Sequence, residues 1–140
     1  MDVGDIPAVA ELERQLFSCP WSRQAFLDTL NQDTLFVTAR IGDAIAGYCG
    51  MYCYAGKEGE ITNVAVSPRF QNQGIGRRML TYLLEQACGR GMTQIVLEVR
   101  VSNANAIHLY EKAGFKNCGI RKNLYELPRE DGMIMVLERT

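Results

Sequence analysis

Apolar residues recur at helical spacing near the start of the chain. In the stretch DIPAVAELERQLF they fall three or four positions apart, at Ile6, Val9, Leu12 and Leu16. This spacing predicts a helix with one apolar face. Asp5 is a candidate N-cap for it, and Pro7 suits its first turn. The stretch CPWSRQAFLDTL predicts a second helix, which Ser22 would cap.

The pattern then changes to that of strands. Residues 34–55, TLFVTARIGDAIAGYCGMYCYA, form two runs rich in branched and aromatic residues on either side of Gly42 and Asp43. A glycine and an aspartate between two such runs are typical of a hairpin. Residues 59–68, GEITNVAVSP, predict a further strand that ends at Pro68.

Helical spacing returns after this strand. Between Gly74 and Gly89 one stripe of a predicted helix contains Ile75, Met79, Leu83 and Ala87. The stretch TQIVLEVRV predicts the next strand, and SNANAIHLYEKAG predicts a short helix that ends at Gly114. The stretches FKNCGIRKNLYEL, residues 115–127, and GMIMVLER, residues 132–139, predict two final strands that pair with each other.

The order of strand, helix and strand in the middle of the chain indicates the fold class. A crossover of this length makes ITNVAV and IVLEV parallel, with the helix packed on one face. The flanking hairpins make the sheet mixed and mostly antiparallel. The prediction is therefore a single α/β (α+β) domain over residues 1–140, with three layers.

Composition and charge exclude several classes of function. The net charge of −1 argues against a strongly basic nucleic-acid binder, and no apolar run approaches the roughly 20 residues of a membrane span. The N-terminal stretch lacks the basic and apolar blocks of a signal peptide.

The five cysteines form no C-x-x-C pair, and histidine occurs once. These counts argue against a zinc site or a disulfide framework and favour the cytoplasm. Cys49 and Cys53 fit buried thiols on one strand face.

The stretch QNQGIGRRML, residues 71–80, places two glycines and two arginines where a helix is predicted to start. The first turn of a helix attracts anions through free N–H groups and the helix dipole. Glycine lets an anion approach the backbone. A phosphate or pyrophosphate site fits the stretch, and so does a tight turn with two solvated arginines. A Walker loop would need Gly-Lys-Ser/Thr, and a dinucleotide fingerprint would need glycine in place of Met79.

A third motif, Gln/Arg-x-x-Gly-x-Gly/Ala, is matched by Gln71, Gly74 and Gly76. With this motif the chain resembles the GCN5-related N-acetyltransferases, the GNAT superfamily. The stretches NVAVSPRFQNQGIGRRML, LEVRVSNANAIHLYEKAGF and RKNLYELPREDGMIM are similar, in this order, to the family's pyrophosphate turn, its second cofactor-contacting region and its closing hairpin. Together they resemble the RimI branch, bacterial enzymes that acetylate the N-terminal alanine of a small-subunit ribosomal protein.

The resemblance implies acetyl-CoA as co-substrate, no metal, a central parallel strand pair that splays, and a ribosomal protein N-terminus as acceptor. It implies that backbone groups of Val64, Ala65 and Val66 bind the pantetheine arm and the thioester. The other cofactor-binding residues that it implies are Gln71, Asn72, Gln73, Gly74, Ile75, Gly76, Arg77 and Asn103. The family usually has a short strand before the first helix. This sequence, which reaches VGDIPAV almost at once, would have that strand shortened or missing.

Glu98 is the polar exception in QIVLEVRV. Strand alternation places Ile95, Leu97 and Val99 on one face and Glu98 with Arg100 on the other. A mid-strand carboxylate is costly unless it is paired, hydrated or functional, so an ion pair with Arg100 or with a neighbouring strand would explain it. The resemblance implies instead that Glu98 is the general base. A modest base is enough for a protein N-terminus, whose pKa is about 8 against about 10.4 for lysine.

The resemblance assigns the remaining roles. Tyr110 becomes the general acid that protonates the CoA thiolate, although its spacing from Ile107 alone indicates a core residue. Asn103 would cap its helix in either case. Trp21 and Tyr125 are candidates for lining the peptide channel, and core or rim packing is the alternative for Trp21. Two acceptor classes stay open besides an N-terminus, namely a small-molecule amine and a protein lysine. A non-catalytic CoA-binding module is disfavoured because Glu98 and Tyr110 are both present.

Overall fold

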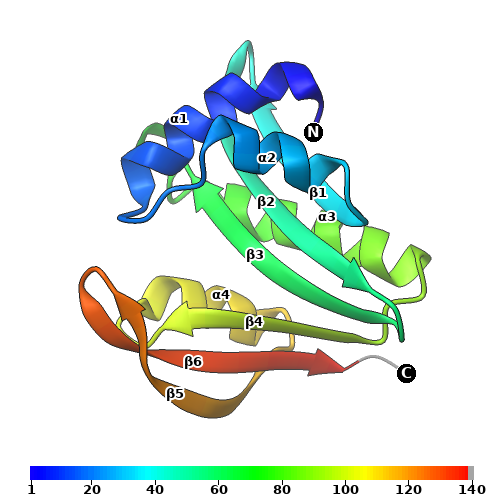
Figure 1. Cartoon of the computed structure of the whole chain (residues 1–140), viewed down its shortest axis with the longest axis vertical. Helices are drawn as coiled ribbons and strands as arrows, with labels where there is room; N and C mark the ends of the chain where they lie inside the picture. The colour runs from blue at the N-terminus through cyan, green and yellow to red at the C-terminus, as the bar shows by residue number, and fades with distance from the viewer. Residues whose placement is uncertain (139–140) are drawn as a thin grey trace.

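The structure, a computed structural model, describes residues 1–138. In these residues one six-stranded mixed sheet has the order β1-β2-β3-β4-β6-β5 (Figure 1). Its strands are β1 (Thr34–Ile41), β2 (Ala44–Tyr54), β3 (Glu58–Val66), β4 (Gln94–Arg100), β5 (Lys116–Glu126) and β6 (Arg129–Glu138). The helices are α1 (Ile6–Leu16), α2 (Arg23–Leu30), α3 (Ile75–Gly89) and α4 (Ala104–Lys112). The predicted last strand reached residue 139, which lies outside the described residues.

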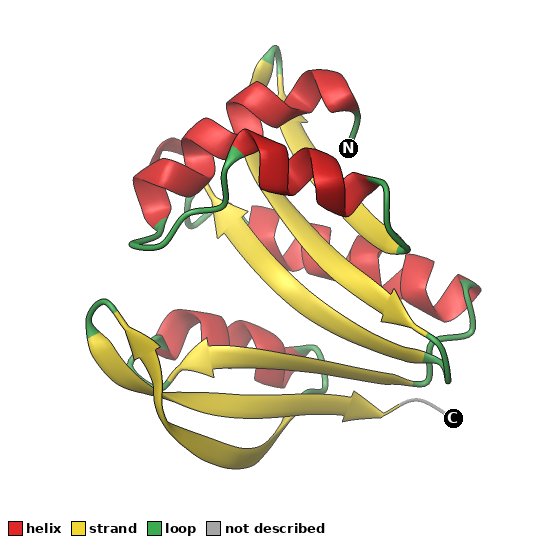
Figure 2. Cartoon of the chain, in the orientation of Figure 1, coloured by secondary structure: helices red, strands yellow, loops and turns green. Residues whose placement is uncertain are grey.

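The helices form two layers around the sheet (Figure 2). Helices α1 and α2 cover one face of β1–β3 through a core that includes Val9, Phe26 and Tyr48. Helices α3 and α4 cover the opposite face through a second core that includes Leu83, Leu97 and Tyr110. The three-layer α/β prediction is therefore confirmed, because α1 and α3 bury most of the apolar stripes that their spacing indicated, on opposite faces of the sheet.

The helix caps follow the sequence in one case and differ in another. Ser22 caps α2 as predicted, since its hydroxyl accepts a hydrogen bond from Ala25 N at 3.1 Å. Asp5 precedes α1 but makes no side-chain cap there. Its carboxylate accepts from Asp2 N at 2.9 Å and pairs with the Arg40 guanidinium. A short 3-10 turn leads into α1, and within it the backbone and a strand cation take both carboxylate oxygens.

The parallel pair in the middle of the sheet is short. Strands β3 and β4 pair only from Glu58 to Glu60 and from Gln94 to Val96 within the described sheet, and beyond this point they diverge (Figure 1). The strands are parallel, as the crossover predicted, and they splay, as the family resemblance implied, because the ladder ends where ITNVAV begins. The register between β2 and β3 shifts next to Thr62, which has no β2 partner. Because a bulge bends its strand, β3 turns away from β4 here. The diverging strands are called the fork below.

Strand β1 lies at one edge of the described sheet. The Met1 ammonium group donates a hydrogen bond to Phe36 O at 3.1 Å along this edge. Residues 1–33 contain a 3-10 turn, α1 and α2 but no strand. The sheet therefore begins at the hairpin that was predicted from Gly42 and Asp43, with Gly42 in a left-handed conformation at φ +61°.

Candidate active site

The turn that precedes α3 presents free backbone donors. Gly74 is the N-cap, with φ +77°, and no described side chain accepts a hydrogen bond from the first helical turn. A Cβ on Gly74 would meet nothing within 4 Å, so the backbone conformation, and not crowding, requires glycine here. Asn72 is also left-handed, at φ +63°. The Gln71 amide donates to Val66 O at 3.1 Å and ties the turn to the end of β3.

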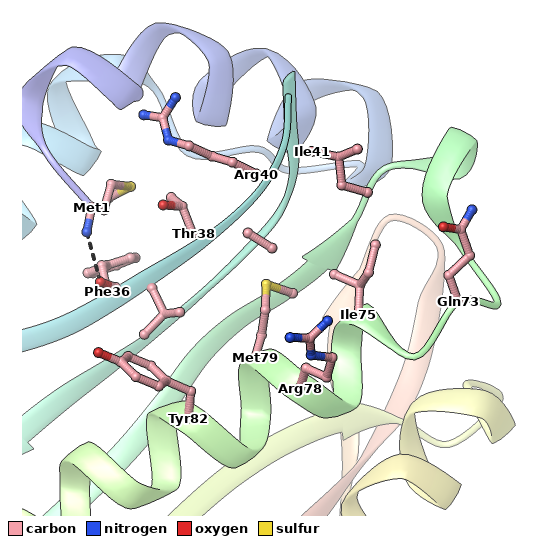
Figure 3. A pocket seen from close by; sticks show the side chains of 12 residues that line it. Met1, Phe36, Thr38, Arg40, Ile41, Gln73, Ile75, Arg78, Met79 and Tyr82 are labelled. Atoms are coloured by element: carbon pink, nitrogen blue, oxygen red, sulfur yellow. Dashed lines mark hydrogen bonds between the residues drawn. The ribbon is translucent and has the colours of Figure 1, made fainter. Parts of the chain in front are cut away.

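A separate cavity of about 690 Å³ lies between α3 and the edge strand β1. Figure 3 shows Arg78 and Tyr82 projecting from α3 toward β1, with Gln73 and Ile75 at the end of the cavity nearest the turn. Two residues that were predicted to hold a pyrophosphate, Gln73 and Ile75, therefore also line this cavity. It lies beside β1, two strands away from the fork, so we do not place the reacting groups in it.

The β3 arm of the fork has an unpaired backbone edge. Val64, Ala65 and Val66 pair with β2 on one side, and the β4 ladder ends before it reaches them. Val64 and Val66 pack into the core under α3, and Ala65 packs into the core under α1. Their side chains are thus committed to packing. Val66 O accepts from the Gln71 amide, and the other main-chain groups on the β4 side have no strand partner in the described sheet and can pair with an extended ligand.

A cavity of about 320 Å³ lies at the closed end of the fork. The residues that line it are Glu60, Ile61, Thr62, Glu98, Leu124 and Tyr125. Two of its polar atoms, Thr62 Oγ1 and Glu98 Oε2, are buried and have no hydrogen-bond partner among residues 1–138. Buried acceptors without partners are costly in a folded protein. The structure brings Glu98 and Tyr125 together here, and adds Glu60 and Thr62, which the sequence did not single out.

Glu98 and Arg100 do not pair with each other. Arg121 Nη1 lies 3.5 Å from Glu98 Oε2, which is ion-pair range without a hydrogen bond. Arg100 instead donates to Leu127 O at 3.1 Å and to Pro128 O at 2.8 Å, and its guanidinium lies 4.3 Å from the centre of the Tyr125 ring. Arg100 thereby holds the β5–β6 hairpin and Tyr125 beside the cavity.

Tyr110 lies in α4, and Asn103 lies at the N-cap of this helix. Tyr110 packs edge-on against Phe115, at 5.9 Å between ring centres. Burial raises the pKa of Tyr110 above its usual value of 10, so its hydroxyl keeps its proton at neutral pH. Asn103 caps α4 as predicted, because its side chain accepts from Ala106 N at 3.2 Å.

The loop between α1 and α2 is fixed by a buried carboxylate. Glu13 accepts hydrogen bonds from the Tyr48 hydroxyl, from Asn63 Nδ2 at 3.0 Å and from Trp21 N at 2.9 Å. The Trp21 ring packs against Phe26, at 5.2 Å between centres, and it is not among the residues that line the fork cavity. Glu13 was not among the predicted site residues, although it lies four positions after Val9 on the apolar stripe.

The same loop reaches the closing hairpin. The Ser18 hydroxyl donates to Leu127 O, so the α1–α2 loop and the β5–β6 turn meet on the side of the sheet that carries Glu98. In the described part of the chain no three His, Cys, Asp or Glu side chains gather as metal ligands would. None of the described helices is long and apolar enough to cross a membrane.

Comparisons with known proteins agree on one family. The profile of the Acetyltransferase (GNAT) family matches residues 6–115. The ribosomal protein bS18-alanine N-acetyltransferase of Salmonella typhimurium is 36% identical over 139 residues, 98% of this chain and 93% of that protein. The enzyme of the same name from Escherichia coli K12 is 34% identical over the same shares. The crystal structure of the E. coli ribosomal-protein-S18-alanine N-acetyltransferase superimposes with a TM-score of 0.91, covering 100% of this chain and 91% of that one.

Proposed function

The chain belongs to the acetyltransferase (GNAT) family and is an N-acetyltransferase, and from this premise we propose that it acetylates the N-terminal alanine of ribosomal protein bS18 with acetyl-CoA in the cytoplasm. The observation that carries the proposal is Glu98, whose buried Oε2 has no hydrogen-bond partner among residues 1–138 and lies in a cavity at the closed end of the fork. The names of relatives 34–36% identical along nearly the whole chain support this acceptor.

The residues present fit acetyl-CoA. The pyrophosphate would be held by the left-handed turn and the first turn of α3, Gln71 to Arg77, where no described side chain competes for the N–H groups. The pantetheine arm would pair with the free edge of Val64 to Val66, and Asn103 would contact the cofactor from the start of α4. When bound, acetyl-CoA supplies an acetyl group activated as a thioester.

Glu98 and Tyr110 divide the two proton transfers. Glu98 accepts a proton from the acceptor amine, directly or through one water, and frees the nitrogen lone pair. As the new N–C bond forms and the C–S bond breaks, Tyr110 donates its proton to the leaving sulfur. A backbone N–H of the free β3 edge stabilises the negative charge that develops on the carbonyl oxygen. Solvent then removes the proton from Glu98 and restores the one on Tyr110.

The acceptor peptide would approach on the α1–α2 side of the sheet. Tyr125 lines the cavity directly. Trp21 holds the α1–α2 loop through its packing and its backbone hydrogen bond to Glu13. We therefore propose that it lines the peptide channel at the end farther from the cavity.

The test is steady-state turnover of an alanine-starting peptide by the purified chain, followed by mass spectrometry of the product. We expect Nα-acetylation of this peptide, with little turnover of polyamines or of a lysine in an N-terminally blocked peptide. Glu98→Gln and Tyr110→Phe should each lower kcat by about 100-fold with coenzyme A still bound, and the exposed Glu85→Gln serves as control. Preferred turnover of polyamines or lysine would overturn the acceptor, and unchanged kcat in both variants would overturn the proton roles.

A further inference from the structure

We propose that Glu60 and Thr62 form, together with Glu98, a three-acceptor binding site for the primary ammonium group of the acceptor. The inference rests on the proposed function and extends it to two residues outside the recognised motifs. All three residues line the same 320 Å³ cavity.

The position of Glu60 in the sheet brings it to this cavity. Glu60 is the last β3 residue that pairs with β4, where it lies opposite Val96. Glu98 is two residues beyond Val96, and alternate residues of a strand share a face. The carboxylates of Glu60 and Glu98 therefore project on the same side of the sheet, one from each arm of the fork at its closed end.

The polar atoms of the cavity are chiefly acceptors. Thr62 Oγ1 and Glu98 Oε2 are buried without hydrogen-bond partners among residues 1–138. Glu60 Oε1 accepts from the Tyr54 hydroxyl at 2.8 Å, which orients the carboxylate and leaves Oε2 for a ligand. Arg121 Nη1 lies 3.5 Å from Glu98 Oε2, and Arg121 does not line the cavity.

A primary ammonium group complements this lining. It carries one positive charge and three N–H donors, and it is mostly protonated at neutral pH because the pKa of an α-amino group is about 8. One donor for each of Glu60, Thr62 and Glu98 would satisfy every N–H, and charge-assisted bonds of this kind are the strong ones. Glu98 then accepts one proton, while Glu60 and Thr62 keep hold of the nitrogen. These two residues bind the amine without exchanging protons with it.

The experiment compares Glu60→Gln and Thr62→Val with the control Glu58→Gln, an exposed carboxylate on the same strand. With an alanine-starting peptide, we expect the peptide KM to rise about tenfold in each of the two variants, as for one lost charge-assisted hydrogen bond. The KM for acetyl-CoA, the melting temperature and the control should not change, and kcat should stay within about threefold. Calorimetric titration of the peptide into protein saturated with coenzyme A should show the same weakening without turnover.

A second acceptor peptide tests how many N–H donors of the ammonium group the site binds. A peptide that starts with N-methylalanine has one N–H fewer, so its KM with the unaltered chain should be about tenfold higher. In Thr62→Val the increase in KM caused by the N-methyl group should be smaller, because the hydroxyl that would lose its N–H donor is already absent. Two results would overturn the inference while the proposed function stands. One is an unchanged peptide KM in both Glu60→Gln and Thr62→Val, and the other is an equal rise in the KM of the peptide and of acetyl-CoA together with a lower melting temperature. An unaltered chain that neither binds nor acetylates the alanine peptide would overturn both.

Discussion

Replacing Tyr48 by phenylalanine should destabilise the chain by a predictable amount. Tyr48 is fully buried, and its hydroxyl donates to Glu13, which is 2% exposed. Burial, and then the bond to Glu13, raise the pKa of Tyr48 far above 10, so the hydroxyl stays a donor at every pH at which the chain is folded. Tyr48→Phe keeps the ring, which packs edge-on against Phe26 at 5.7 Å between centres, and removes only this donor.

The expected loss in the free energy of unfolding follows from the hydrogen bond that the buried Glu13 carboxylate loses. A hydrogen bond to a charged group contributes about 1.5–3 kcal/mol, and the Glu13 carboxylate stays buried with two of its three donors. We therefore expect a loss of about 2 kcal/mol in the free energy of unfolding. For 140 residues the unfolding entropy is about 0.3 kcal/mol/K, so the melting temperature should fall by about 7 °C.

Thermal and urea unfolding followed by circular dichroism would measure both quantities. Tyr82→Phe is the matched control, because Tyr82 is 51% exposed, and it should stay within about 0.5 kcal/mol of the parent chain. In a Glu13→Gln background the cost of Tyr48→Phe should drop by at least about 0.5 kcal/mol, as for two groups in contact. A melting temperature within 2 °C of the parent, or an equal cost in both backgrounds, would refute this account of the buried network.

Three further predictions concern the cofactor turn, the hairpin and the cysteines. Gly74→Ala forces a side chain into the left-handed region at φ +77°, which costs about 1–2 kcal/mol, so calorimetry should show coenzyme A bound at least about fivefold more weakly than by Gly4→Ala; equal affinities would contradict this. Arg100→Lys loses the paired bonds to Leu127 O and Pro128 O, so amide exchange at residues 124–130 should quicken and the peptide KM should rise, with the KM for acetyl-CoA unchanged. Burial raises the pKa of Cys49 to about 12 and also raises the pKa of Cys53; at pH 8 both thiols stay neutral, so iodoacetamide should label only Cys19, Cys88 and Cys118 in the folded chain and all five cysteines in urea, by intact mass.

The sequence could predict the elements because burial follows their periods. The spacing of apolar residues predicts the stripe of α3 and the alternation in β4. The same alternation placed Glu98 on the face opposite the apolar core. Tyr125 was a candidate for lining the peptide channel, and the structure brings it to the same cavity as Glu98. Their proposed roles stay predictions.

The partners of charged side chains could not be read from spacing. Glu98 and Arg100 share a strand face, yet Arg100 bonds to carbonyls of a hairpin about 30 residues away, whose position depends on the β5–β6 register. Asp5 was expected to cap α1, and a cation on β1 takes its carboxylate instead. Glu13 did carry a signal, since a charged residue within an apolar stripe indicates a buried polar contact. The early end of the β3–β4 ladder depends on a bulge next to Thr62 that no local pattern marks.

Strands β3 and β4 pair through three residues of each strand in the described sheet. The segments that would hold the nucleotide lie mostly on the β3 side of this short ladder, and Glu98 and the β5–β6 hairpin lie on the β4 side. The hairpin meets the β3 side at the Ser18–Leu127 hydrogen bond and at the shared cavity, so a change of hairpin sequence away from these contacts disturbs few neighbours across the ladder. Such a layout lets acceptor preference drift during evolution while the grip on the acyl donor is inherited unchanged.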